Sequence, residues 1–324
     1  MTGLIFKRPS YEDVQKEMRN LFTGKRKREG KVAMQAVSKY YFFDERTRAR
    51  IKKGRPFHDI LDDKATYDEL MWMTFRYFGK HLQPGPDLNK RMAKWGWDIG
   101  RLFKQFGIPS QFAFGEAYHL YERHNVNGKV FDYSCGWGNR LLAALCNKLD
   151  YTGVDTNPRL VEKLRECARD FNDTMGFDLK VDVRAQPSEV LQEEWRNQFG
   201  LAMSSPPYFD VEIYNGEQTS TTKYPEYNAW LEGYLRPTIM NCKEYLIPGG
   251  KFILNIKNMG KLKMYDDAMR ICHESGMEFV GEEVLHVTRR TGANSTKTQG
   301  MSASNEKLMV FMKKPTLPDA QNEV

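Results

Sequence analysis

The sequence predicts an α/β protein built on a doubly wound, mainly parallel sheet. After Asn127-Gly128, short apolar runs alternate with stretches of helical periodicity. Strands that alternate with helices imply crossover connections, which pair strands in parallel. The last two apolar runs have no helical stretch between them, which predicts an antiparallel addition at the end of the sheet. Before Asn127 the alternation is absent, and a mainly helical region is predicted there.

The predicted sheet has seven strands. They are expected at residues 129–133, 151–155, 179–184, 201–204, 251–256, 278–288 and 307–313. Helices are expected between them at residues 140–149, 158–171, 189–198, 227–246 and 264–275. Pro158 suits the first turn of its helix, because the N–H that proline lacks would have no partner there. Pro237 predicts a bend in the helix that contains it.

The chain is predicted to have three parts. These are a basic, mainly helical region over residues 1–108, a sheet domain over residues 109–315 and a loose tail over residues 316–324. Helices of the first part are expected at residues 11–22, 67–78 and 90–106. Ser10 is a candidate N-cap for the first of these helices. Two basic runs, at residues 25–31 and 46–55, are expected to be loops.

Positive charge is concentrated in the first part of the chain. The formal net charge is +7, and residues 1–125 alone carry 25 Lys and Arg against 15 Asp and Glu. The remaining residues carry 24 basic and 27 acidic side chains. One interpretation is that the first part contacts a polyanion such as a nucleic acid. The alternative is that the basic side chains keep a helical region soluble, and charge alone does not separate the two.

The cysteines and the apolar runs indicate the cellular compartment of the protein. The five cysteines are widely spaced and contain no C-x-x-C pair, so neither a disulfide framework nor a metal site is expected. No apolar run approaches the roughly 18 residues of a membrane span. The chain begins without the apolar core of a secretion signal. A cytoplasmic protein is therefore expected, in the host cell if a phage encodes it.

A glycine-rich turn, residues 132–140, follows the first predicted strand. Glycines at such a turn let the backbone approach a ligand closely, and in open α/β sheets this is where ligands bind. The turn lacks both the G-K-[ST] of a phosphate loop and a complete G-x-G-x-x-G. Asp155 ends the next strand, where a carboxylate can accept hydrogen bonds from ribose hydroxyls. The alternative is a plain strand–turn–helix joint, but together the two features favour an adenosine-containing ligand.

The most specific motif is Ser205-Pro206-Pro207-Tyr208, at the end of the fourth predicted strand. It resembles the (Asp/Asn/Ser)-Pro-Pro-(Tyr/Phe) motif of amino-group DNA methyltransferases, and residues 132–138 resemble their cofactor motif. Residues 136–142 and 208–214 are also similar to phage and bacterial DNA modification methylases, some of which serve restriction–modification systems. The resemblance covers roughly residues 109–313. It implies a class I methyltransferase fold, S-adenosylmethionine as cofactor and double-stranded DNA as partner.

The chemistry of this family explains the motif. An exocyclic amine of a base is a poor nucleophile, because its lone pair is delocalised into the ring. The Ser205 side chain and the Pro206 carbonyl would accept its two hydrogens and localise the lone pair, while Pro207 helps to fix the backbone. Tyr208 would stack on a base flipped out of the duplex. The bland alternative is a proline-rich turn, and the motif leaves N6 of adenine and N4 of cytosine both open.

The resemblance also implies a set of cofactor-binding residues. They are Asp132, Ser134, Gly136, Gly138, Asp155, Gln186 and Phe112. Gln186 ends the third predicted strand, where the family often has an acidic residue that contacts the adenine amino group. Phe112 and Phe114 lie where the family has a segment that closes over the methionine moiety, with core packing as the alternative. Asn255, at the end of the fifth strand, either lines the pocket or satisfies backbone groups.

The DNA-contacting residues are less specifically marked. Arg289, Arg290 and Lys297 occupy a polar loop over residues 286–300, which would contact phosphates or form a solvated hairpin tip. Glu212, in the loop after the motif, could fold over the target base or lie on an ordinary surface loop. Two other functions stay open: methylation of an amine in RNA or protein, and a DNA-binding module with an inactive methylase core.

Overall fold

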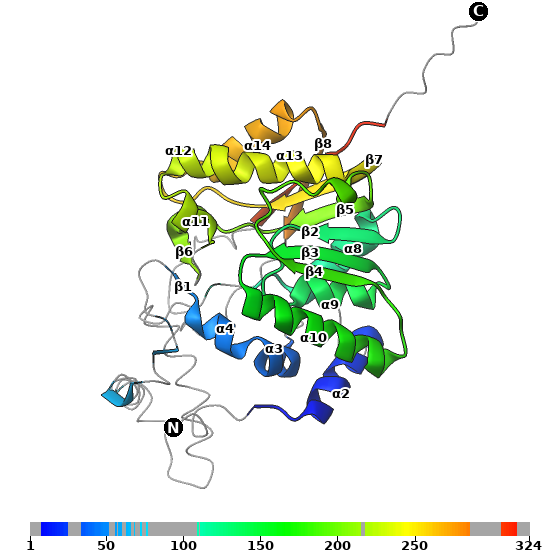
Figure 1. Ribbon diagram of the computed structural model, residues 1–324, viewed down its shortest axis with the longest axis vertical. Helices are drawn as coiled ribbons and strands as arrows, with labels where there is room; N and C mark the ends of the chain where they lie inside the picture. The colour runs from blue at the N-terminus through cyan, green and yellow to red at the C-terminus, as the bar shows by residue number, and fades with distance from the viewer. Residues whose placement is uncertain are drawn as a thin grey trace, which may run out of the picture.

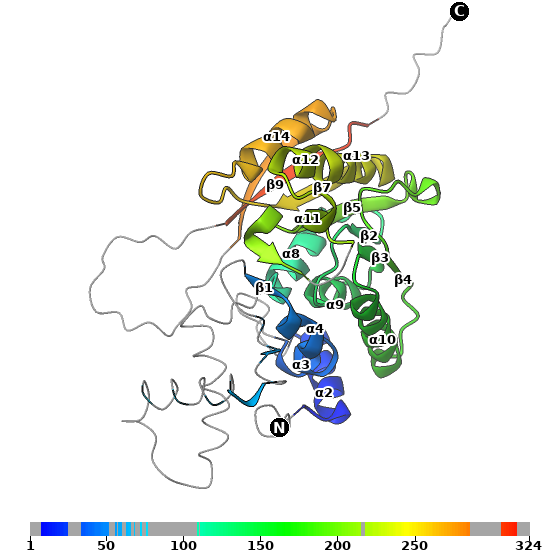
Figure 2. The ribbon, with the colours of Figure 1, turned by 60° about the vertical axis from the view of Figure 1, so that its left-hand side comes forward.

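The computed structural model describes residues 8–24, 34–51, 109, 111–214, 218–285 and 306–315, with isolated residues between 56 and 76. Its main sheet has the strand order β4-β3-β2-β5-β7-β9-β8 (Figure 1). The strands are β2 Lys129–Asp132, β3 Asp150–Asp155, β4 Val181–Ala185, β5 Phe199–Ser204, β7 Leu246–Asn255, β8 Glu278–Leu285 and β9 Glu306–Met312. The first five are parallel, and β9 is antiparallel to both β7 and β8 (Figure 2). The predicted doubly wound, mainly parallel seven-stranded sheet with an antiparallel addition at its end is confirmed.

The strand order reverses between β2 and β5. From β2 the chain proceeds outward through β3 to β4, and it then returns to place β5 on the other side of β2. In open α/β sheets, ligands bind at the carboxyl ends of the strands where such a reversal occurs. The turn after β2 and the segment after β5 therefore lie beside each other at this switch point. These are the glycine-rich turn and the Ser205–Tyr208 motif, here called the catalytic corner.

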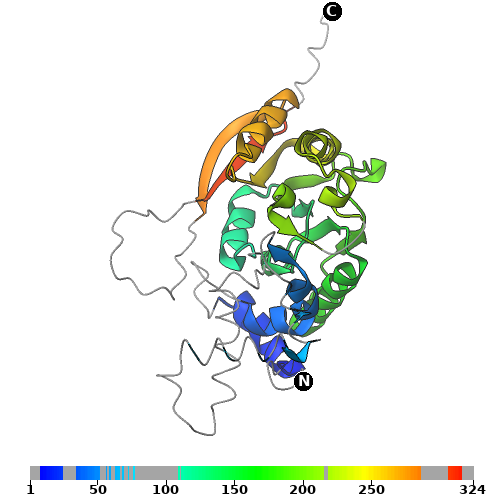
Figure 3. The same ribbon diagram turned by 90° about the vertical axis from the view of Figure 1, so that its left-hand side faces the viewer.

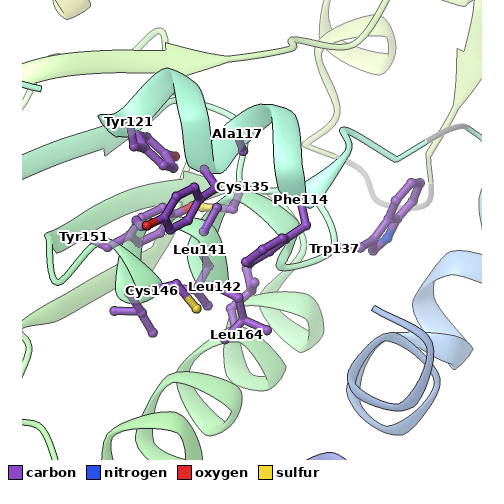
Figure 4. Close-up of a cluster of buried hydrophobic side chains, with 14 of the residues drawn as sticks. Phe114, Ala117, Tyr121, Cys135, Trp137, Leu141, Leu142, Cys146, Tyr151 and Leu164 are labelled. Carbon is purple, nitrogen blue, oxygen red and sulfur yellow. The ribbon is translucent and has the colours of Figure 1, made fainter. Parts of the chain in front are cut away.

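Helices cover both faces of the sheet (Figure 1). One face carries α8 Phe114–His124, α9 Asn139–Cys146 and α10 Pro158–Met175, and the other carries α12 Tyr227–Trp230, α13 Arg236–Tyr245 and α14 Met264–Glu274. Successive strand residues point to opposite faces, so Val130 packs in one core and Phe131 in the other. Figure 4 shows part of the first core, around Phe114, Tyr121 and Tyr151.

The described N-terminal elements form an outer layer against α10 (Figure 3). They are α2 Tyr11–Phe22, α3 Gln35–Tyr41, α4 Phe43–Arg48 and β1 Arg50–Ile51. The predicted Ser10 cap is confirmed, and it forms a capping box with Asp13. Val14, Met18 and Phe42 are fully buried in the same core as α9 and α10. The described part of residues 8–51 therefore shares its core with the sheet domain.

Several predicted elements differ from the structure. The helix predicted at 189–198 is wrong: only the 3-10 turn Glu193–Trp195 forms, with Trp195 buried in the core, Leu191 partly buried against it and Val190 exposed. The helix predicted at 227–246 is interrupted by a π-helical turn, Leu231–Leu235, just before Pro237. Proline has no N–H to donate, so a change of helical register at this point is expected.

The N-terminal predictions are only partly open to comparison. The loop predicted over residues 46–55 is wrong for residues 46–51. Arg46 to Arg48 end α4, and Arg50–Ile51 form β1. The run 25–31, the helix 90–106, the loop 286–300 and the tail 316–324 lie outside the described residues, as does most of the helix 67–78.

Phe42→Ala tests whether the N-terminal helices and the sheet share one core. Removing a fully buried phenylalanine costs about 3–5 kcal/mol of unfolding free energy. We expect urea unfolding followed by far-UV and near-UV circular dichroism to shift as one cooperative transition. Tyr11→Ala is the control, since Tyr11 is 38% exposed and its loss should cost far less. Two transitions, with the later one unmoved by Phe42→Ala, would contradict the shared core.

Candidate active site

The glycine-rich turn links β2 to α9 and has two left-handed glycines. Gly136 has φ +60° and Gly138 has φ +78°, a region that residues with a Cβ rarely adopt. The two differ in their surroundings. A Cβ on Gly136 would meet nothing closer than 3.8 Å, whereas one on Gly138 would lie 2.5 Å from the Phe42 ring. Gly136 therefore leaves space at the turn, and Gly138 admits the N-terminal layer.

Asp132 holds the turn from inside the protein. Oδ1 accepts from the Ser134 amide at 3.1 Å and from Arg140 Nη2 at 3.2 Å. Oδ2 accepts from Arg140 Nε and from the Tyr151 hydroxyl, both at 2.8 Å. A carboxylate has about four acceptor positions, and Asp132 has no exposed surface. These contacts argue against the predicted direct contact with a cofactor, and Asp132 acts instead on the shape of the turn.

The catalytic corner begins next to this turn. The Ser204 hydroxyl, at the end of β5, donates to the Ser134 carbonyl at 3.1 Å. The Tyr133 hydroxyl donates to the Ser204 carbonyl, also at 3.1 Å. Ser205 follows directly, so the predicted corner and the predicted cofactor turn are in contact through adjacent residues.

Within the corner, the side chains are held from both sides. Pro206 is buried, while Ser205, Pro207 and Tyr208 are half-buried. The Tyr208 hydroxyl donates to Asn255 Oδ1 at 3.4 Å, and Lys257 Nζ lies 5.9 Å from the centre of the Tyr208 ring. Asn255 is thus brought to the corner from the end of β7.

Phe209 anchors the end of the corner. Its φ of +46° is uncommon for a residue with a bulky side chain. Its buried ring packs edge-on against Tyr227 and Trp230, with centroid distances of 5.5 and 5.7 Å. The aromatic packing compensates for a backbone strain of about 1–3 kcal/mol.

The loop after the corner returns to the glycine turn. Its strand β6, Glu212–Ile213, pairs antiparallel with β1. The Tyr214 ring lies 6.0 Å from the Trp137 ring, and the Arg46 guanidinium lies 5.5 Å from that ring too. Figure 4 shows Trp137 at the edge of its cluster, toward the N-terminal helices. Glu212, a predicted DNA contact, is half-buried and accepts from the Tyr214 hydroxyl at 2.7 Å.

Asp155 and Gln186 end neighbouring strands beside the turn. Asp155 Oδ2 accepts from the Gly136 amide at 3.3 Å, and Oδ1 accepts from the Asn157 amide at 3.0 Å. Burial raises the pKa of Asp155 to about 6 despite these two hydrogen bonds. The Gln186 amide nitrogen Nε2 is buried without a hydrogen-bond partner, which is uncommon in native proteins. The two residues are joined through their backbones, since the Gln186 N–H donates to the Asp155 carbonyl at 3.0 Å.

Two further predicted residues lie at the margins of the turn. The Phe112 ring is 5.5 Å from the Arg140 guanidinium, and its carbonyl accepts from Asn139 Nδ2 at 2.6 Å. The Ser134 hydroxyl lies 3.4 Å from the hydroxyl of Tyr234, in the π-helical turn. Tyr234 and Tyr214 were not predicted, because no local motif marks them. π-helical turns within α-helices, such as the one that contains Tyr234, often occur at functional sites.

Some predictions cannot be placed. Arg289, Arg290 and Lys297 lie outside the described residues.

Over the part of the chain that is described, no group of three or more His, Cys, Asp or Glu side chains is arranged to hold a metal ion. No helix of that part combines the length and the apolar character needed to cross a membrane. All five cysteines are buried free thiols.

Known proteins resemble the chain in fold. No protein-family model matches it, and no curated protein matches it. A TehB-like SAM-dependent methyltransferase from Corynebacterium glutamicum is 16% identical over 71% of this chain and 100% of its own, with a TM-score of 0.40.

Two other solved structures show the same degree of similarity. The glycopeptide N-methyltransferase MtfA, solved with S-adenosylmethionine, is 14% identical over 62% of this chain and 94% of its own, with a TM-score of 0.43. The cyclase SpnF is 18% identical over 53% of this chain, with a TM-score of 0.39, and this chain spans 59% of its length. At these identities the similarity concerns the fold alone.

Gly138→Ala and Gly136→Ala test the different surroundings of the two glycines. Each substitution should lower the free energy of unfolding by about 1–2 kcal/mol, because each glycine has a left-handed backbone conformation. Gly138→Ala should lose more, because its Cβ would overlap the Phe42 ring. Urea unfolding measures both losses. Phe42→Leu should restore part of the loss in Gly138→Ala and none in Gly136→Ala. Equal losses in the two single variants would contradict the contact.

Proposed function

We propose that the chain transfers the methyl group of S-adenosylmethionine to an exocyclic amine, N6 of adenine or N4 of cytosine, in DNA. The observation that carries the proposal is the adjacency of the glycine turn and the catalytic corner at the switch point of the sheet, where Ser204, the residue before the corner, donates to the Ser134 carbonyl of the turn. A methyl donor at the turn and an amine at the corner would then be neighbours, which is what in-line transfer needs.

The residues at the turn fit an adenosine-containing cofactor. The ionised Asp155 carboxylate would accept from the two ribose hydroxyls. The orphaned Gln186 amide would complete its hydrogen bonding on the edge of the adenine ring, where its oxygen can accept from the amino group and its nitrogen can donate to a ring nitrogen. Gly136 leaves the backbone accessible beside them. When bound, S-adenosylmethionine supplies a methyl group on a positively charged sulfur, which is a good leaving group.

The corner would prepare the amine. Ser205 Oγ and the Pro206 carbonyl would each accept one N–H hydrogen and draw the hydrogens out of the ring plane, which localises the lone pair on the nitrogen. The amine nitrogen would then be the acceptor for the methyl group that bound S-adenosylmethionine supplies, and one proton would leave the nitrogen for solvent. The Tyr208 ring would stack on the flipped base. Its hydroxyl bond to Asn255 fixes the ring in place before the base arrives.

DNA is proposed as the substrate from the motif and from the basic first part of the chain. Arg46, one of the basic residues that suggested a phosphate contact, instead lies against Trp137. The lysines and arginines of the run 25–31 and of the loop 286–300 remain the proposed phosphate contacts.

The central experiment compares methyl transfer from labelled S-adenosylmethionine to duplex DNA, RNA and protein. We expect incorporation into DNA, recovered after digestion as N6-methyladenine or N4-methylcytosine. Tyr208→Ala should lower kcat about 5- to 150-fold, because stacking a base on an aromatic ring is worth about 1–3 kcal/mol. Tyr208→Phe keeps the ring and is the matched control. Incorporation only into RNA or protein, or none at all, would refute the DNA assignment.

Asp155 predicts how cofactor binding depends on pH. Ribose hydroxyls donate more strongly to the ionised carboxylate than to the protonated carboxyl, and the raised pKa leaves Asp155 mostly protonated below about pH 6. The affinity for S-adenosylhomocysteine, measured by calorimetry, should be constant above about pH 7 and fall toward tenfold per pH unit below 6. Asp155→Asn should bind more weakly at pH 8 and lose this dependence. A flat wild-type profile from pH 5 to 7 would exclude the assigned role.

The raised pKa of Asp155 also affects the stability of the free protein, which should fall with rising pH where cofactor affinity rises. A folded pKa above the ordinary Asp value means that the folded state binds the proton more tightly than the unfolded state. Asp155 therefore reduces stability as pH rises from about 4 to about 6. Ligand binding, which favours the ionised form, should offset this loss.

A further inference from the structure

The proposal concerns Arg140, a buried charged residue that the chemistry above does not use. Its side chain lies on α9 and is 5% exposed. Two of its nitrogens, Nε and Nη2, donate to the Asp132 carboxylate. Nη2 also donates to the Ser134 carbonyl, in the glycine turn, and to Ser204 Oγ at 3.0 Å, at the foot of the catalytic corner. One guanidinium therefore contacts both halves of the site.

The backbone does not join these two halves. The pairing of β2 with β5 consists of Val130 with Leu201 and Phe131 with Ala202, and it ends there. Beyond that point the two chains separate into the glycine turn and the corner. Side chains take over the connection, namely Arg140, the Ser204 hydroxyl and the Tyr133 hydroxyl.

Ser204 closes a ring of hydrogen bonds with Arg140. Its hydroxyl accepts from Nη2 and donates to the Ser134 carbonyl, which Nη2 also contacts. The planar fork of arginine can satisfy two carboxylate oxygens and still reach these acceptors, whereas the single ammonium of lysine cannot. Asp132 supplies the counter-charge that makes a buried guanidinium tolerable.

We propose that Arg140 is a positioning residue that fixes the catalytic corner relative to the glycine turn, acting through Ser204. The inference rests on the proposed function. Ser204 precedes Ser205 directly, so a shift of Ser204 would carry the amine acceptors with it. A displacement of about 1 Å between reacting groups can cost about 100-fold in rate. The cofactor contacts at Asp155 and Gln186 lie on other strands and would be spared.

Ser204→Ala is the first test, because it breaks the ring of hydrogen bonds and leaves the Asp132–Arg140 pair intact. We expect kcat for DNA methylation to fall at least about tenfold, with the Kd for S-adenosylhomocysteine changed less than about twofold. Ser275→Ala is the matched control. It also removes a buried serine hydroxyl, one that donates to the Cys272 carbonyl at the end of α14, and it should leave kcat unchanged.

Arg140→Lys and the double variant test whether the two residues act as one unit. Arg140→Lys keeps a positive charge opposite Asp132 and should lower kcat at least as much as Ser204→Ala. The double variant should lose no more than Arg140→Lys alone, because the second substitution removes a contact already broken. If the fold-losses of kcat in the two single variants multiply in the double variant, the two residues act independently and the coupling is overturned. A parallel fall of kcat, cofactor affinity and Tm would reduce Arg140 to a structural role and overturn the proposal.

The outcomes also separate this inference from the function on which it rests. If the wild-type chain methylates DNA and Ser204→Ala is equally active, only the positioning role is overturned. If the wild-type chain binds S-adenosylhomocysteine but methylates no DNA, the proposed function fails, and this inference fails with it.

Discussion

The ion pair between Asp132 and Arg140 is the interaction on which the site depends. Removing two charges from water costs several kcal/mol for each ion, and the loss is recovered only when the charges pair well and their remaining positions are hydrogen-bonded. Here the carboxylate is fully engaged by Arg140, Tyr151 and the Ser134 amide. The pair favours one conformation of the glycine turn, since another would lose the hydrogen bonds that the Ser134 amide and carbonyl make to buried charged groups. The shape of the turn is therefore set before a ligand binds.

The N-terminal layer adds a second constraint from outside the turn. Phe42 packs where Gly138 has no side chain, and Trp137 lies between Arg46 and Tyr214. Glu45 of α4 accepts from Nδ2 of Asn157, two residues after Asp155, at 2.6 Å. The basic first part of the chain thus has two kinds of positive residue. Some, such as Arg46, pack within the protein, and net charge alone could not distinguish these from residues whose charge faces solvent.

Sequence periodicity was sufficient to predict the sheet, because each strand and each long helix has its own local pattern. It also placed Asp155, Gln186 and the catalytic corner at strand ends, where the topology brings them to one edge. Periodicity could not predict the hydrogen-bond network of Arg140, Ser204 and Tyr133. Their contacts join residues 64 to 71 positions apart, and they depend on how β2 and β5 diverge. The false helix at 189–198 has the same origin, since packing against Trp195 overrode a weak local preference.

Independent of any motif, unfavourable features concentrate at this edge of the sheet. Asp155 is buried enough to raise its pKa, the Gln186 Nε2 is buried without a partner, and Phe209 is held at a positive φ. Each of these costs stability in the free protein, and each lies at or just beyond the carboxyl end of a strand, β3, β4 or β5. Perturbed ionisation and backbone strain of this kind cluster at functional sites, where a ligand offsets the cost. A polar ligand that offers hydroxyl donors to Asp155 and an acceptor to Gln186 Nε2 would relieve the first two together, which is why an adenosine-containing cofactor fits this edge better than an apolar one.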